Sequence, residues 1–161
     1  MHGSAKFSAL TLAATLALTF GAAGPAAAQA APPVRVGDLF RPSAPPAGWT
    51  YLGYGCKETF TVCAHALRRG AAFLVVQTRP VNHRPGQPLL SERVVRVTPY
   101  AARAGETTGW NCYIDEQWPL LVFVPPHRRS ARAIVLDKAD NYVEVERRLT
   151  QPNWCEFDVV D

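Results

Sequence analysis

Residues 110–113 have the sequence Trp-Asn-Cys-Tyr, and residues 154–157 have the sequence Trp-Cys-Glu-Phe. Both segments place a cysteine beside aromatic residues, in a context that is typical of a β-strand. A disulfide between Cys112 and Cys155 would join the last strand to an earlier one, across the strand-like segments between them. We therefore expect this bond to fasten the fold, and we expect function to lie in the loops that it holds in place.

Short apolar and β-branched segments, separated by glycine, proline and polar residues, fill the chain from residue 49 onward. The segments lie at 49–52, 60–67, 71–78, 89–100, 110–115, 118–124, 131–136, 142–149 and 154–160. Such a series predicts an all-β fold, an antiparallel β-sandwich or small barrel of about eight short strands, stapled by disulfides. A two-residue turn at 116–117 is expected between two of these strands.

Residues 57–69 have two interpretations. Phe60, Cys63 and Leu67 follow one another at the spacing of a helical face, which favours an α+β fold with one helix near 57–69. The β-branched residues of the segment, and its short glycine-ended connection to the next apolar run, favour a β-hairpin. We predict the hairpin and keep the helix as the alternative.

Residues 1–30 have the pattern of a secretory signal peptide. Lys6 gives a positive start, residues 8–20 form an apolar run, and small residues follow, so that cleavage is expected after Ala28 or Ala30. The run is shorter than the roughly 20 apolar residues that a membrane-spanning helix requires. We therefore predict a periplasmic or secreted product that does not span the membrane once it is processed.

The product that remains is expected to have two parts, a proline-rich extended segment over residues 31–48 and a single β-rich domain over 49–161. Proline lacks a backbone donor and biases its neighbours toward extended backbone, which disfavours a helix or a central strand. The whole chain has 17 Lys and Arg residues against 13 Asp and Glu residues, a net charge of +4. This excess is too small to indicate a nucleic-acid-binding protein, so no nucleic-acid partner is expected.

Four cysteines, Cys56, Cys63, Cys112 and Cys155, follow the predicted leader. An even number in an exported chain indicates disulfides, and four cysteines allow three pairings. We favour Cys56–Cys63 with Cys112–Cys155, since the first pair closes a short loop at a small entropic cost. The chain has neither a C-x-x-C motif nor a cysteine pair with paired histidines, so we expect no metal and no cofactor.

The sequence contains no catalytic motif. The serines that follow the leader are Ser43, Ser91 and Ser130, and none stands in G-x-S-x-G or S-x-x-K. His65 alternates with small apolar residues and is expected to be packed in a strand. His83 and His127 lie in proline-bounded loops, and the sequence leaves open whether they converge. We expect a protein that is not an enzyme, with a small envelope hydrolase acting on glycan or peptide as the alternative.

The basic turns are the best candidates for a binding site. The residues concerned are Arg68, Arg69, His127, Arg128, Arg129 and Arg132. Guanidinium groups at strand ends present planar pairs of donors that match the oxygens of carboxylates and phosphates. We predict that these residues recognise a protein or an anionic component of the cell envelope. The alternative is that they serve only surface solubility.

Aromatic residues form a further candidate surface, for an interface or for sugar stacking. Trp110 and Trp154 flank the two cysteines of the long-range pair, and aromatic side chains commonly pack against the disulfide of a β-sandwich. We therefore expect these two tryptophans in the core.

Together these features predict an exported, non-catalytic binding module of the cell envelope, inhibitor-like or immunity-like in its action. In size, leader and use of disulfides the chain is similar to small periplasmic lysozyme inhibitors and toxin-immunity proteins, although no motif carries a residue role over from them. A structural subunit of an envelope assembly is a further alternative, which a large exposed apolar patch would favour.

Overall fold

The computed structural model describes residues 32–81, 92–149 and 154–159. The chain divides into two units, residues 1–30 and residues 31–161, and every strand belongs to the second. The predicted leader and His83 lie outside the described residues. All elements of the described part are strands, which confirms the all-β prediction. None of its residues forms a helix long and apolar enough to cross a membrane.

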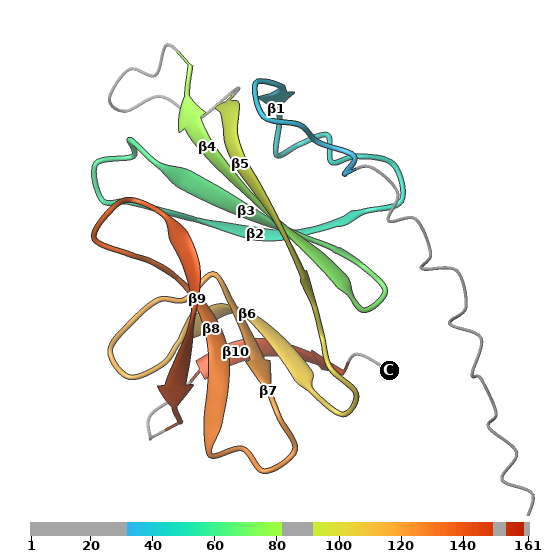
Figure 1. Ribbon diagram of the computed structural model, residues 1–161, viewed down its shortest axis with the longest axis vertical. Coiled ribbons are helices and arrows are strands. Elements are labelled where there is room, and N and C mark those ends of the chain that lie inside the picture. The colour runs from blue at the N-terminus through green and yellow to red at the C-terminus, as the bar shows by residue number, and fades with distance from the viewer. Residues whose placement is uncertain (1–31, 82–91, 150–153, 160–161) are drawn as a thin grey trace, which may run out of the picture. The chain divides into compact units, whose positions relative to one another are not determined.

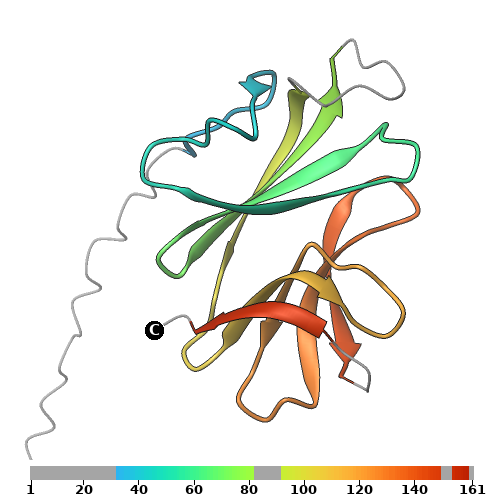
Figure 2. The same ribbon diagram turned by 180° about the vertical axis from the view of Figure 1, so that it is seen from behind.

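The strands form two antiparallel five-stranded sheets (Figures 1 and 2). In the first sheet the order is β1-β5-β4-β3-β2, with β1 at Leu39–Phe40, β2 at Thr50–Cys56, β3 at Cys63–Arg69, β4 at Ala72–Pro80 and β5 at Glu92–Ala101. In the second sheet the order is β10-β6-β7-β8-β9, with β6 at Thr107–Tyr113, β7 at Leu121–Val124, β8 at Ser130–Leu136, β9 at Tyr142–Arg148 and β10 at Trp154–Val159. The end of β5 leads directly into the second sheet through β6 (Figure 1).

A shared core joins the two sheets. Ala64 and Ala66 of β3, together with Phe73 of β4, belong to one buried cluster with Phe123 of β7 and Ile134 of β8. The rings of Phe73 and Phe123 meet edge to face, with their centroids 5.2 Å apart. Because alternate residues of a strand point to opposite faces, this cluster uses one face of each sheet and gives a sandwich.

The proline-rich segment covers the other face of the first sheet. Val34, Phe40 and Trp49 are buried against Leu74 and Val76 of β4. The two inner strands β3 and β4 are therefore buried on both faces, with five and six consecutive buried residues. A continuous buried run is the expected pattern for a strand with both faces covered.

The alternative of a helix near residues 57–69 is wrong. Residues 63–69 form β3, which pairs along its whole length with β4, and residues 57–62 form the turn that precedes it. The helical spacing of Phe60, Cys63 and Leu67 has no structural meaning here, because Phe60 is exposed while the other two are fully buried. The turn predicted at 116–117 is displaced by one residue. Asp115 and Glu116 are the turn residues, between Ile114 and Gln117.

Both predicted disulfides are confirmed, Cys56–Cys63 between β2 and β3, and Cys112–Cys155 between β6 and β10. A β-bulge lies beside the second disulfide. Between the pairs Trp154–Tyr113 and Glu156–Trp110, β10 has one residue where β6 has two, Asn111 and Cys112. Asn111 has a positive φ of 49°, as the first residue of such a bulge often does. Cys112 and Cys155 lie on the same face of the second sheet, against its outer apolar cluster.

Candidate binding surfaces

The β7–β8 turn holds three predicted binding residues, His127, Arg128 and Arg129, and all three are exposed. Arg128 has a φ of 52°, in the left-handed region that residues other than glycine rarely adopt. Its N–H donates to the Pro125 carbonyl oxygen at 3.0 Å, and the Arg129 N–H donates to His127 Nδ1 at 3.0 Å. Neither guanidinium makes a hydrogen bond or ion pair with another residue of the described ranges. A hydrogen-bonded turn therefore presents two unpaired arginines.

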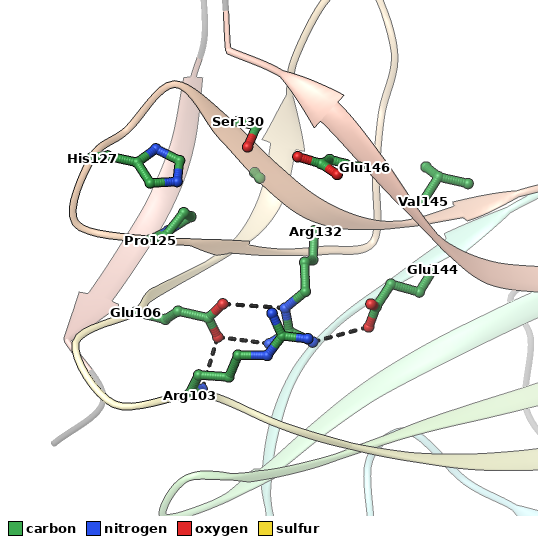
Figure 3. Close-up of a pocket in the computed structure, with 10 residues that line it drawn as sticks. Arg103, Glu106, Pro125, His127, Ser130, Arg132, Glu144, Val145 and Glu146 are labelled. Carbon is green, nitrogen blue, oxygen red and sulfur yellow. Dashed lines mark hydrogen bonds and ion pairs between the residues drawn. The ribbon is translucent and has the colours of Figure 1, made fainter.

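A cavity of about 340 Å³ lies beside this turn, between β8, β9 and the β5–β6 connection (Figure 3). Charged side chains dominate its wall, namely Arg103, Arg132, Glu106, Glu144 and Glu146. Figure 3 shows the guanidinium of Arg132 between the carboxylates of Glu106 and Glu144. The charges inside the cavity thus largely compensate one another.

Arg132, the last of the predicted binding residues in the chain, uses its guanidinium for contacts within the protein. Its Nε and Nη2 donate to the two oxygens of Glu106 at 3.1 and 2.6 Å, and its Nη1 donates to Glu144 at 3.0 Å. Nη2 also donates to the Ala101 carbonyl oxygen, and the guanidinium lies over the Phe123 ring, 4.4 Å from its centroid. Burial tends to raise the pKa of Glu106, but the hydrogen bonds and charge of Arg132 outweigh it and hold that pKa below its ordinary value.

The cavity also brings His127 near Ser130 and several carboxylates, which is the combination that a hydrolase would require. The hydrogen bonding of His127 is wrong for that role. Its Nδ1 accepts the backbone N–H of Arg129, so the neutral ring carries its proton on Nε2 and has no free nitrogen to act as a base. Figure 3 shows no bond between Ser130 and His127.

Two further arginines join the turn through contacts that are distant in sequence. Arg148 of β9 is the cross-strand partner of Ser130, and the next residue, Leu149, donates its N–H to the Arg129 carbonyl oxygen at 2.9 Å. Arg103 lines the same cavity and is close enough to Glu106 to lower the pKa of that carboxyl. We call the exposed residues Arg103, Arg128, Arg129 and Arg148 the basic rim. Sequence reasoning missed Arg103 and Arg148, because only the strand pairing brings them there.

Arg68 and Arg69 lie elsewhere, on the β3–β4 turn. The guanidinium of Arg69 lies over the ring of Trp49, 4.7 Å from its centroid, and Arg68 Nε donates to the Gly70 carbonyl oxygen. Both line a separate cavity of about 510 Å³ together with Trp110. The two arginine turns therefore do not form one site.

Of the two tryptophans expected in the core, Trp110 is partly buried and packs against the shared core cluster, whereas Trp154 contradicts the expectation. Trp154 is 53% exposed, and Trp118, in the turn region after β6, is 70% exposed. The Trp118 ring lies 5.0 Å from that of Tyr113 and 6.5 Å from that of Trp154, centroid to centroid. We call Tyr113, Trp118 and Trp154 the aromatic ridge. Tyr113 is next to Cys112 in β6 and Trp154 is next to Cys155 in β10, so strand alternation places the ridge and the disulfide on opposite faces of these two strands.

His65 is fully buried, as its strand pattern predicts. The sequence did not indicate its partners. Tyr51 and His65 Nδ1 are hydrogen-bonded at 3.0 Å, and His65 Nε2 lies 2.6 Å from Glu92 Oε2, which also accepts the hydroxyl of Thr78. Within the described ranges no group of three His, Cys, Asp or Glu residues has a geometry that could hold a metal ion. Comparison of the chain with protein-family models, with curated protein sequences and with solved structures finds no match, so its own surfaces guide the functional argument.

Proposed function

We propose that this protein is an exported, non-catalytic binding module of the cell envelope, and that its basic rim binds carboxylate or phosphate groups of a partner. The observation that carries the proposal is the contrast between neighbouring arginines. Arg132 has carboxylate and carbonyl partners for its donors, whereas Arg128 and Arg129 have no such partners among the described residues. Arginines that the fold does not use are available to an external anion.

The backbone supports this assignment. Two hydrogen bonds close the β7–β8 turn, and Arg128 retains a left-handed backbone where glycine would be less strained. Strain at an exposed position of this kind is frequently found at ligand-binding segments. A turn that is already ordered loses less conformational entropy when it binds, so more of its interaction energy appears as affinity.

The disulfides and the predicted leader support the compartment. Disulfides persist in oxidising environments such as the periplasm or the exterior of the cell, and both pairs are formed in this chain. Envelope polymers in these environments carry many carboxylate and phosphate groups, which is the chemistry that a guanidinium fork matches.

The experiment compares two variants with equal changes in charge. Arg128→Glu with Arg129→Glu alters the basic rim, and Arg79→Glu with Arg96→Glu alters exposed arginines of the first sheet. Immobilised polyglutamate and polyphosphate serve as carboxylate and phosphate probes, with binding measured over a range of salt concentrations. We expect the first pair to weaken binding about tenfold or more and the second about twofold or less. Equal losses would show a response to net charge alone and would refute the proposed site.

A hydrolase is the alternative that the test must exclude, because the cavity gathers His127, Ser130 and carboxylates although the hydrogen bond to His127 Nδ1 does not suit a general base. Its test is turnover of peptidoglycan and of peptide esters by the wild type and by His127→Ala. Turnover that is lost in the variant would favour the enzyme over the binding module.

A further inference from the structure

The aromatic ridge brings exposed large aromatic side chains together at one edge of the second sheet. Trp118 and Trp154 expose 70% and 53% of their surfaces, and Phe157, also on β10, exposes 56%. Exposed aromatic area of this size is unfavourable in water, and burying it against a partner yields about 25 cal/mol for each Å² removed. Tryptophan and tyrosine are also the residues most enriched among those that dominate the energy of protein interfaces.

The ridge is held in a defined arrangement. Tyr113 and Trp154 are direct cross-strand partners, and the adjacent residues Cys112 and Cys155 are joined covalently. Trp118 follows a tight turn that the reciprocal hydrogen bonds of Ile114 and Gln117 close at 2.9 and 3.0 Å. Rings that are fixed before binding lose little entropy when a partner covers them.

The edge of the second sheet lies open beside the ridge. In the sheet order, β10 pairs with β6 alone, so its other side has no strand among the described residues. The opposite edge strand, β9, alternates Glu144, Glu146 and Arg148 on one face, which is a common protection against pairing with other chains. β10 carries the exposed Trp154 and Phe157 as well as Glu156, and exposed apolar residues on an unpaired edge favour strand addition.

Two exposed carboxylates lie close to the ridge, in addition to Arg147, whose guanidinium donates to Gln117 in the turn before Trp118. Glu116, in the turn before Trp118, and Glu156, two residues after Trp154 on the same face of β10, are both exposed. The protein as a whole carries a net charge of +4, so these carboxylates depart from its general character. A basic side chain placed here would meet both a carboxylate and the face of an indole ring, which attracts cations.

The tilt of the rings argues against sugar as the occupant. Neighbouring ring planes in the ridge are inclined by 52° and 67°, so they form no flat platform on which consecutive sugar rings could stack. A peptide strand fits better, because successive side chains leave its backbone on alternate faces and contact differently oriented rings.

We propose that the edge of β10 and the aromatic ridge bind an extended segment of a partner protein, which adds to the second sheet as a strand and places lysine or arginine side chains against Trp118, Trp154 and the nearby carboxylates. Apolar residues on the other face of that segment would contact Phe157. This surface is separate from the basic rim, so the two proposals succeed or fail independently.

The test uses a heptapeptide of alternating lysine and valine as the probe and one of alternating glutamate and valine as its control. We expect the lysine peptide to change the tryptophan fluorescence saturably and to slow hydrogen exchange at the β10 amides. Trp118→Ala and Trp154→Ala should each weaken its binding about tenfold, and Arg128→Glu with Arg129→Glu should not weaken it.

Four results would overturn the proposal. They are equal binding of both peptides, unchanged binding by the tryptophan variants, a stronger fluorescence response to chitohexaose, and sedimentation of the free protein as a dimer that Trp154→Ala dissociates. The last result would assign the edge to a second copy of the chain.

Discussion

His65 and Glu92, 27 positions apart in the chain, meet with 2.6 Å between Nε2 and Oε2, and both side chains are fully buried. The centroid of the Phe40 ring lies 4.8 Å from that of the imidazole, so the proline-rich segment covers the buried pair. Burial and the charge of Glu92 raise the pKa of Tyr51. The Tyr51 hydroxyl therefore stays protonated, and it is hydrogen-bonded to His65 Nδ1. This polar chain connects β2, β3, β4 and β5 beneath the segment.

Replacing Glu92 by Leu is expected to lower the free energy of unfolding by about 3–5 kcal/mol, because it leaves the buried imidazole without its acceptor. The free energy of unfolding is measured by urea denaturation at neutral pH. Glu92→Gln retains an acceptor oxygen and should cost less. If both variants were as stable as the wild type, the buried pair would not contribute to folding.

The same carboxyl predicts a pH dependence. Burial tends to raise the pKa of Glu92, but the hydrogen bond and charge of His65 and the hydroxyl of Thr78 outweigh it, so the pKa lies below its ordinary value of 4.5. The stability that follows from this shift is present above pH 4.5 and is lost as the pH falls through the lower, folded-state value. Urea denaturation at a series of pH values below 5 should give a flatter dependence for Glu92→Gln than for the wild type. Parallel curves would contradict the lowered pKa.

Arg132 and Arg128 should differ sharply in their effect on stability. Arg132→Met leaves Glu106 buried without its cation and is expected to lower the free energy of unfolding by about 3 kcal/mol. Arg128→Ser, at an exposed and unpaired side chain, should change it by about 0.5 kcal/mol or less. Thermal denaturation of the two variants under the same conditions compares their stabilities. It distinguishes an arginine that stabilises the fold from an arginine that is available to a ligand.

The two disulfides should contribute unequally. With sequence separations of 7 and 43, chain entropy assigns about 2.5 kcal/mol to Cys56–Cys63 and about 4 kcal/mol to Cys112–Cys155. Replacing each pair by alanine and comparing urea midpoints checks the order. A larger loss from the short loop would mean that local packing, and not the constraint on the unfolded chain, dominates.

Glu116→Gly is expected to raise the free energy of unfolding by about 0.5–1 kcal/mol, since Glu116 has a φ of 63° that glycine adopts without strain. Glu58→Gly, an exposed glutamate in another turn whose φ is not positive, is the matched control and should lower it. The stabilised variant should also bind the lysine–valine peptide more weakly, because it has lost a carboxylate beside the ridge.

Local sequence patterns predicted the strands, the β3–β4 hairpin and the cysteine pairing, because turn residues and loop closure depend on near neighbours. Such patterns could not predict the hydrogen-bond partners of Arg132. Its partner Glu106 comes from the connection before β6, and its partner Glu144 comes from β9. Only the assembled sheet order shows that they surround it.

The side of β6 on which Trp110 lies could not be predicted either, because it depends on a single extra residue. Without the bulge at Asn111, Trp110 and Cys112 would have shared one face of the strand. The link between His65 and Glu92 has the same origin, since strand register and not sequence distance brings them together.

The position of the Cys112–Cys155 bond behind the ridge makes oxidation a step in the maturation of this surface. In a reducing compartment the bond would not persist, and β10 would be held to β6 by its backbone pairing alone. Trp154 would then lack the covalent support that fixes it beside Tyr113. A chain with free thiols would therefore be poorly able to engage a strand-adding partner, and it would gain that ability as its thiols are oxidised.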